Sequence, residues 1–570
     1  MKKSIFKFLN SIKARKHNSS FFFFLFSFST FLIIPFISTT SCSSSSQETK
    51  PEKPVEPEKP VEPGKPVEPT NLYTYDSHIY KKMPVININT TNGVNFAIEH
   101  KDTFVLHESE SGISYYEFKK QEFNYHDATI SLENFDENFK LDNLSAQVKI
   151  RGNTTTAYDK KPIRIKFAQK QEMFHLNKNY KSKDWVLLAN WRDVSMLRNN
   201  LGLYLGQILY KNMGLYGSDF VNVEVYINGE YWGIYLLCEQ NEVAAGRVNI
   251  NKVETNYQGV DIGYFLELDC YSEFEPPLNQ ISINYNNRAF LSPENDPDIN
   301  IFNNVSTYQY TIKSKIYAEA QKNFIQNYLE NIYRICYKAI INKECWEFNE
   351  NKTDIIKSTT NTDPNIALEN VLDIDSAASV LILQEIIFDW DINQSSFFMS
   401  VDCSKEGDGK LRFQAPWDFD LSFGITKSYE ASQYYDKLYA ANSKNPWLVL
   451  LYKSDKIKEK IKEKWLGIYE NKVAEKMLEY IDTLSNLYVD YYQKNYEKWH
   501  NIGPYIKEKI DQFEAANNEN LNETCTWDAC YYILVPEASW KCTTQKEATF
   551  FLKEWLDYRF KILNSFWLTK

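Results

Sequence analysis

Two aspartates alternate with aromatic residues in the segment Pro416-Trp417-Asp418-Phe419-Asp420, and Gly424 closes the run. A carboxylate in an otherwise apolar segment costs desolvation free energy unless it is paired or binds a cation. Carboxylate oxygens are natural ligands of Mg²⁺, which also keeps water and phosphate oxygens around it. The segment therefore predicts either a divalent-cation site at Asp418 and Asp420 or a turn whose acids cap backbone N–H groups.

A second acidic segment lies upstream, where Asp389 and Asp391 precede Asn393. A predicted helix precedes this segment and a predicted strand follows it, which makes it a loop between rigid elements. Loops held in this way often carry function. An acid at this place would orient or deprotonate an attacking hydroxyl group, and helix or turn capping is the alternative interpretation.

A third segment is basic, with Lys149 and Arg151 before a Gly-Asn-Thr turn at residues 152–154 and with Arg164 and Lys166 after it. A turn of this kind between two strands that carry cations presents N–H groups and positive charge to phosphate. An ordinary hairpin with exposed basic residues is the alternative.

Several common catalytic signatures are missing from the sequence, including H-E-x-x-H, G-x-S-x-G, a Walker loop and G-x-G-x-x-G. The seven histidines are scattered, and none pairs with another at metal-ligand spacing. The formal net charge of −11 argues against a general nucleic-acid-binding protein. These observations disfavour a histidine-dependent hydrolase, a zinc enzyme and a nucleic-acid partner.

The elements that must position these segments are strands first and helices later. Alternating apolar and polar residues, and the Asn228-Gly229 turn of a hairpin, predict strands at 83–88, 128–132, 146–151, 163–167, 223–227, 231–237 and 264–269. Apolar residues at helical spacing predict helices at 196–208, with Asp193 or Ser195 as cap, and at 317–341, 374–388, 457–499 with breaks and 546–568. The sequence thus predicts an α+β protein with a β-rich N-terminal lobe and a helical C-terminal lobe.

The N-terminus has the layout of a secretory signal. Basic residues precede an apolar run at 21–37, and small residues then lead to Cys42. This order predicts a lipoprotein signal peptide at residues 1–42, with Cys42 as the lipidated residue. An uncleaved membrane anchor and a fully secreted form are the alternatives, and all three place the rest of the chain outside the cytoplasm.

A proline-rich repeat of Lys-Pro-Val-Glu-Pro type fills the predicted linker at residues 43–70. Proline at this density favours an extended polyproline conformation and a semi-rigid spacer. The remaining chain is divided into an N-terminal β region at 71–145 and a larger domain at 146–570. We expect a protein of the cell envelope, held at the membrane by its lipid anchor.

The ordered blocks of the larger domain resemble the CotH family, the spore-coat-protein-H-like atypical protein kinases. Arg151-Gly152-Asn153-Thr154-Thr155 and Lys161-Pro162-Ile163-Arg164-Ile165-Lys166-Phe167 are similar to two of its elements. Three more blocks follow in the family's order, namely Asp184 to Asn190 with Leu197-Arg198-Asn199, then Asn228 to Tyr235, then Pro416 to Asp420. The resemblance spans residues 80 to 565.

The resemblance implies an atypical, two-lobed protein-kinase-like fold that transfers the γ-phosphoryl group of ATP to protein side chains with Mg²⁺ or Mn²⁺. It implies Asp391 as the catalytic acid, Asp418 and Asp420 as metal ligands, and Asn393 as a candidate for a further ligand. It places Arg151, Asn153, Arg164 and Lys166 at the ATP phosphates. The expected partner is a protein substrate at the cell surface.

The chain departs from the family pattern after the loop acid, where Ser395 and Ser396 stand in place of an asparagine. The lysine–glutamate pair of a kinase small lobe has two candidate acids, Glu239 and Glu267. A catalytically inactive, kinase-like surface lipoprotein that acts as a binding or adhesion module is the alternative function. Because Asp391, Asp418 and Asp420 are all present, the sequence favours the active enzyme.

Overall fold

The computed structural model describes residues 73–99, 104–108, 114–285, 307–389, 391–424, 437–440, 443–501 and 542–568. Residues 72–570 form one compact unit. The predicted signal peptide, Cys42 and the proline-rich linker lie outside the described residues. Within the described ranges, no helix is both long enough and apolar enough to cross a membrane.

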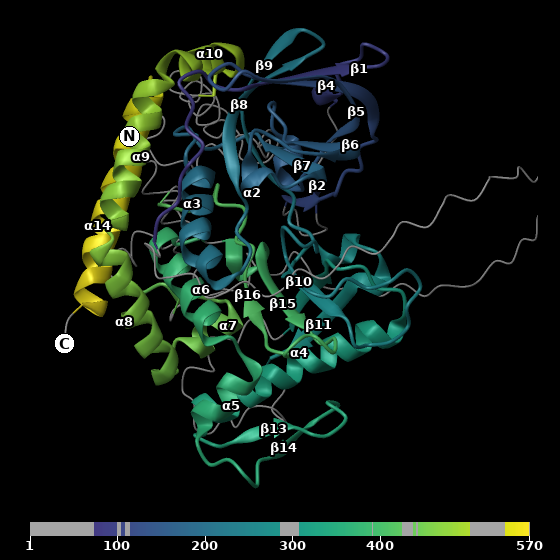
Figure 1. Ribbon diagram of the computed structural model, residues 1–570, viewed down its shortest axis with the longest axis vertical. Helices are drawn as coiled ribbons and strands as arrows, with labels where there is room; N and C mark the ends of the chain where they lie inside the picture. Colours follow the sequence, from purple (N-terminus) through teal and green to yellow (C-terminus); the bar gives the residue numbers. More distant parts are fainter. Residues whose placement is uncertain are drawn as a thin grey trace, which may run out of the picture. The chain divides into compact units, whose positions relative to one another are not determined.

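Seven strands of the N-terminal half close into a barrel in the order β1-β4-β5-β6-β7-β9-β8 (Figure 1). They are β1 (Val85–Thr90), β4 (His126–Asn134), β5 (Phe139–Ile150), β6 (Ile163–Gln171), β7 (Ser182–Leu188), β8 (Phe220–Ile227) and β9 (Glu230–Glu239). Neighbouring strands are antiparallel except β1 and β8, whose parallel pairing closes the barrel. A short hairpin of β2 (Phe104–Glu108) and β3 (Ser114–Phe118) lies between β1 and β4 in the sequence.

Alternation along each strand separates the barrel interior from its outer face. On β6, Ile163, Ile165 and Phe167 are buried in the barrel core, whereas Arg164 is half-buried and Lys166 is exposed. The domain boundary predicted between residues 145 and 146 falls inside β5, which pairs with β4 on one side and β6 on the other. The residues on both sides of that boundary therefore belong to the same barrel.

A second sheet has the order β11-β12-β10-β15-β16, and all of its pairs are antiparallel. Its strands are β10 (Gly263–Leu268), β11 (Gln280–Asn284), β12 (Thr307–Ile312), β15 (Phe397–Asp402) and β16 (Arg412–Phe413). Because β15 and β16 come after the long helices of the middle of the chain, the C-terminal half contains strands as well as helices. A small hairpin of β13 (Trp346–Phe348) and β14 (Ile355–Lys357) packs beside α4.

Helices make up most of the rest. They are α2 (Leu176–Asn179), α3 (Arg198–Tyr210), α4 (Glu319–Ile340), α5 (Pro364–Val371), α6 (Ile374–Ile387), α7 (Pro446–Leu451), α8 (Asp455–Glu470), α9 (Val473–Leu487), α10 (Val489–Trp499) and α14 (Gln545–Trp567). The central helix α6 is buried around its whole circumference and contacts α3, α8 and α14. Figure 1 shows α9 and α14 running side by side, and α10 lies against β9 of the barrel.

The predicted elements are confirmed with shifts of a few residues at their ends. The Asn228-Gly229 hairpin joins β8 to β9, and the helices predicted at 317–341, 374–388 and 546–568 are α4, α6 and α14. The helix predicted at 196–208 is α3, and its N-cap is Leu197 in place of the predicted Asp193 or Ser195. Asp193 still stabilises the start of α3, because its Oδ2 accepts a hydrogen bond from Arg198 N at 2.8 Å. The α+β class with a β-rich N-terminal region is therefore confirmed.

Candidate active site

The segment that carries Asp418 and Asp420 follows β16 and turns against the start of α3. Asp418 has a φ of +67°, in the left-handed region that residues other than glycine seldom adopt. Phe419 N donates to Asn199 Oδ1 at 2.8 Å, and Arg198 Nε donates to Ser422 O at 3.2 Å. The first turn of α3 therefore fixes the backbone between and after the two aspartates.

Close packing of the Phe419 ring on α3 also holds this turn in place. A Cβ atom on Gly202 of α3 would lie 2.1 Å from Cγ of the buried Phe419 ring. Only glycine at this position allows the ring to lie directly on the helix. The anchored ring holds the residue between Asp418 and Asp420, so both carboxylates leave the backbone from a rigid position.

The loop that carries Asp391 begins where α6 ends. Phe388 closes α6 in the left-handed conformation, with φ +53°, and the 3₁₀ turn η9 (Asp391–Asn393) follows. Asp391 N donates to Asp389 Oδ1 at 3.0 Å, and Ser395 Oγ donates to Asp391 Oδ2 at 3.0 Å. A backbone hydrogen bond of 2.6 Å from Phe423 N to Ile387 O ties this loop to the one that follows Asp420.

The two loops bring four carboxyl groups, those of Asp389, Asp391, Asp418 and Asp420, within electrostatic reach of one another. Burial raises the pKa of Asp418 well above its usual range, and the charges of Asp420 and Asp391 raise it further. Burial raises the pKa of Asp391 to about 6, with the hydrogen bond from Ser395 acting in the opposite direction. A hydrogen bond joins the carboxyls of Asp418 and Asp420 and raises the pKa of Asp418 while lowering that of Asp420. The arrangement favours a proton or a cation between these two groups.

Two arginines supply the opposing positive charge. The buried Arg192, from the loop before α3, lowers the pKa of both Asp420 and Asp391. Arg151, at the end of β5, lowers the pKa of Asp418, and its guanidinium lies 5.8 Å from the centre of the Trp417 ring. The acids therefore lie between a cation from the barrel and a cation from the α3 loop.

The turn after Arg151 has the predicted compact form. Gly152 has a φ of +112°, and a Cβ atom there would lie 2.2 Å from Thr155 Oγ1, so the turn requires glycine. Asn153 O accepts hydrogen bonds from Thr156 N at 3.3 Å and from Thr156 Oγ1 at 2.8 Å as the 3₁₀ helix η3 (Thr154–Ala157) begins. The turn thus presents Arg151 to the acids from a fixed strand end.

The family model of CotH, described as "CotH kinase protein", matches residues 148–559. This match covers most of the chain and all of the acidic and basic segments described above. The chain belongs to the CotH kinase protein family. No curated protein matches the chain.

The CotH assignment confirms the resemblance seen in the sequence and supports a kinase-like function in general. The structure gives a physical reason why the blocks near Asn199 and Asp418 occur together in the family pattern, since the start of α3 holds the Asp418 turn. Among the residues predicted to act, the structure brings Asp391, Asp418, Asp420 and Arg151 together.

Arg164 and Lys166 lie on the outer face of β6; the charge of Arg164 lowers the pKa of Arg151, whereas Lys166 is two residues further along the strand. Arg164 forms an ion pair with Asp184, with Nη2 at 2.7 Å and Nε at 3.1 Å from Asp184 Oδ1. Lys166 Nζ lies 5.9 Å from the centre of the Tyr125 ring. These two residues are therefore engaged with neighbours on the barrel surface.

Asn393 lies beside the acids, but both the nitrogen and the oxygen of its side-chain amide form hydrogen bonds with other residues. Its Nδ2 donates to Tyr439 Oη at 2.9 Å, and its Oδ1 accepts from Lys444 N at 2.8 Å. In the place where the family pattern has an asparagine, Ser396 Oγ lies 3.5 Å from Asp418 Oδ2. The serine, and not Asn393, is the neutral side chain that contacts the predicted metal ligand.

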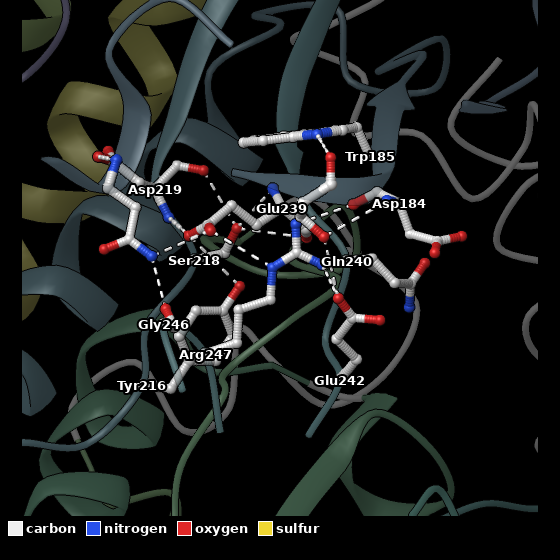
Figure 2. Close-up of polar contacts among 12 residues, drawn as sticks. Asp184, Trp185, Tyr216, Ser218, Asp219, Glu239, Gln240, Glu242, Gly246 and Arg247 are labelled. Carbon is white, nitrogen blue, oxygen red and sulfur yellow. Dashed lines mark hydrogen bonds and ion pairs between the residues drawn. The ribbon is translucent and has the colours of Figure 1, made fainter. Parts of the chain in front are cut away.

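The two candidate glutamates of the small-lobe pair have different partners. Glu239 at the end of β9 forms a buried ion pair with Arg247 Nε at 3.4 Å, and Figure 2 shows it among Asp219, Tyr216 and Glu242. Glu267 on β10 pairs with Lys313 Nζ at 3.0 Å. Glu267 is the one nearer the acids, because its charge acts on Arg151 and it accepts a hydrogen bond from the backbone of Ser396.

The donor set fits a divalent cation of the Mg²⁺ type. Among the residues that the structure describes, no group of three or more His, Cys, Asp or Glu side chains forms a complete set of metal ligands. Mg²⁺ usually takes one or two carboxylates and completes its shell with water and phosphate oxygens. Asp418 and Asp420, which are joined by a hydrogen bond, supply such a pair.

Sequence reasoning gave no role in this site to three of its residues. Asp389 is fully buried, and its Oδ2 has no hydrogen-bond partner among the described atoms. Its spacing from Asp391 repeats the Asp418–Asp420 spacing, a signal that was present in the sequence. Asn199 is in one of the family-like blocks and Arg192 is in none, and only the fold shows that both reach the acidic turns.

Proposed function

We propose that this protein is an extracytoplasmic CotH kinase that transfers the γ-phosphoryl group of ATP to hydroxyl groups of protein side chains, with Mg²⁺ or Mn²⁺. The observation that carries the proposal is the convergence of Asp391, Asp418 and Asp420 with Arg151 of the barrel. Phosphoryl transfer requires positioning, a divalent cation and fixed positive charge more than covalent chemistry. The family match supports the same reaction class.

Each residue has a defined role in this proposal. Asp418 and Asp420 would hold the cation, which would supply positive charge to the phosphate oxygens. Arg151 faces the same phosphates from the barrel side. Asp391 accepts a hydrogen bond from the substrate hydroxyl and directs its oxygen at the γ-phosphorus. As the new O–P bond forms, the bond to the β-phosphate oxygen breaks, ADP leaves, and the hydroxyl proton passes to Asp391 or to water.

The larger architecture fits this role. We infer that the barrel and the helical region with its second sheet serve as the two lobes of a kinase-like fold, with the nucleotide between them. The predicted lipid at Cys42 and the proline-rich linker would hold this unit at the outer side of a membrane. The phosphoacceptor would then be a protein exposed at the cell surface.

The test is a titration of the purified protein with ATP, with and without Mg²⁺ or Mn²⁺, by calorimetry. Transfer of labelled γ-phosphate is followed on the same samples, and Asp418→Asn is compared with the wild type. We expect metal-dependent ATP binding and phosphoryl transfer, both lost in Asp418→Asn. Normal folding of the wild type without nucleotide binding under any metal would overturn the proposal and favour a stalked, inactive binding module.

A further inference from the structure

A cluster of positive charge lies on the outer face of the barrel beside the proposed active site. It consists of Lys149 on β5, Arg164 and Lys166 on β6, and the Tyr125 ring between them, and we call it the β5–β6 patch. Lys149 and Arg164 are directly opposite each other in the strand register. Lys149 Nζ lies 4.8 Å and Lys166 Nζ 5.9 Å from the centre of the Tyr125 ring.

Acidic side chains of the fold neutralise only part of this patch. Like charges directly opposite on neighbouring strands destabilise a sheet. Asp184 pairs with Arg164 and is directly opposite Lys166 in the strand register, but among the described residues neither Lys149 nor Lys166 forms an ion pair with a carboxylate. The pKa of Lys149 is lowered by burial and by the charges of Arg164, Lys120 and Arg151, while Glu122 acts in the opposite direction. An excess of positive charge in a chain with a formal net charge of −11 indicates an anionic ligand.

The patch is continuous with the active site but extends beyond it. Arg151, whose charge acts on Asp418, is two residues after Lys149, just past the end of β5, and its backbone N–H donates to Pro162 O. At about 3.3 Å per residue, the Lys166 position, opposite Gln147, lies about 13 Å along the sheet from Arg151. Lys149 and Arg164 are close enough for their charges to interact with Arg151, whereas Lys166 lies beyond the phosphates of a nucleotide bound at Asp418 and Arg151, so this end of the patch can take a second ligand.

We propose that the β5–β6 patch binds an acidic segment of the protein substrate, next to the hydroxyl that receives the phosphoryl group. This inference rests on the proposed kinase function and specifies its substrate class. Arg164 and Lys166 are two residues apart on one strand face, about 6.6 Å, which is also the spacing of alternate side chains in an extended peptide. The expected acceptor therefore carries acidic residues at alternate positions beside its serine, threonine or tyrosine. The exposed Tyr125 ring provides an apolar surface for the peptide backbone.

Peptide binding in the absence of ATP tests the patch directly. The probe is a fluorescein-labelled peptide in which glutamate alternates with serine, and a matched peptide has lysine in place of glutamate. Anisotropy titrations use the full chain as wild type, Lys149→Glu, Lys166→Glu and, as a control, Lys170→Glu at an exposed position further along β6. We expect the wild type and the control to bind the acidic peptide, and the two patch variants to bind it about tenfold or more weakly. Added salt weakens the binding.

Equal binding of the acidic peptide by the wild type and both patch variants would overturn the proposal. A calorimetric ATP titration of Lys166→Glu, the patch variant farthest from Arg151, separates the two ligands, because the proposal expects the affinity for ATP to stay at the wild-type value. A loss of ATP affinity with unchanged peptide binding would assign the patch to the nucleotide and overturn the proposal. If the wild type binds no ATP but does bind the acidic peptide through Lys149, the kinase function fails while the acidic-segment site stands.

Discussion

Two groups of buried carboxylates in this protein have opposite electrostatic surroundings. Glu239, closing one end of the barrel, accepts hydrogen bonds from Asn177 Nδ2 at 3.0 Å and Asp219 N at 3.2 Å and pairs with Arg247 (Figure 2). After burial, the three largest influences on the pKa of Glu239, from Arg247, Asn177 and the backbone N–H of Asp219, all lower it, and the smaller influence of the Asp219 charge raises it. At Asp418, the two largest influences after burial are other carboxylates, and both raise the pKa.

The difference separates a structural site from a ligand site. Around Glu239, protein atoms complete the hydrogen bonding of the carboxylate, so nothing further is needed for stability. Around Asp418, Asp391 and Asp420, like charges remain close together, which destabilises the fold until a cation or a proton arrives. A cluster of acids that costs stability in the free protein is a candidate for function.

The largest effect is expected from the ion pair at the barrel end. Arg247→Met leaves the Glu239 carboxylate buried without its partner, and this should lower the free energy of unfolding by about 3–5 kcal/mol. Urea denaturation followed by circular dichroism measures the loss. The double variant Arg247→Met/Glu239→Gln has no buried charge and should recover part of it. A loss below about 1 kcal/mol, the scale of an exposed pair, would remove the contrast between the two groups.

In a metal-free buffer, removing a charge from the acidic cluster should raise the free energy of unfolding, which is the opposite of the effect expected at Glu239. The pKa of Asp391 is about 6 in the folded protein and about 3.9 in an unfolded chain, so the folded state holds an extra proton between these values. The free energy of unfolding should therefore fall as the pH rises from about 4 to 6. Asp391→Asn should reduce this fall, to which the raised pKa values of Asp389 and Asp418 also contribute, and should be more stable than the wild type at pH 7 by about 3 kcal/mol.

Urea denaturation at several pH values with a chelator present measures this effect. Asp490→Asn, at an exposed position in the first turn of α10, is the control and should keep the wild-type pH dependence. If Asp391→Asn destabilised the protein at pH 7, Asp391 would belong with Glu239 as a structural acid.

A divalent cation should stabilise the cluster and leave the ion pair unaffected. At a Mg²⁺ concentration of about ten times its Kd, ligand binding adds about 1.4 kcal/mol to the free energy of unfolding. Scanning fluorimetry should detect the increase in Tm for the wild type and for Asp490→Asn. Asp418→Asn should lose the increase, and an equal increase in that variant would place the cation elsewhere.

The smallest effect is expected from a half-exposed pair that joins the segment after β3 to the second sheet region. Lys120 Nζ lies 2.9 Å from Glu275 Oε1, just after the 3₁₀ turn η5 (Ser272–Phe274). Lys120→Met should lower the free energy of unfolding by about 0.2–1 kcal/mol. High salt should cancel the difference from the wild type, because it screens exposed charges. A difference that persists in high salt would show that packing against Phe274 dominates.

The local features of the fold were predictable from the sequence because they depend on neighbours in the chain. The Asn228-Gly229 turn and the apolar spacing of α6 each determine their own element. Closure of the barrel was not predictable, since alternation describes one strand and not its partners. The strands β15 and β16 join β10 in a sheet across more than a hundred residues, which local patterns do not encode.

The candidate site divides in the same way. Asp391, Asp418 and Asp420 were found from acids placed among aromatic residues, and Arg151 from its position before a glycine turn. Their partners Arg192 and Asn199 lie more than two hundred residues before Asp418, and only the packing of α3 shows that they meet. The separation of Lys166 from Arg151 depended on the register of β5 and β6, which the sequence did not determine.

The parallel pairing of β1 with β8 has a consequence for the order in which the chain folds. Val85 of β1 pairs with Glu224 of β8. The first barrel strand to be synthesised therefore cannot form this pairing until one of the last strands has been made. Until β8 is complete, β1 and its neighbours form an open sheet with an unpaired edge, a form prone to association with other chains. Pairing over such a distance is slow because the entropy of closing the loop is lost before the contacts form. The seam between β1 and β8 is therefore the step at which a nascent chain is most exposed to misassembly.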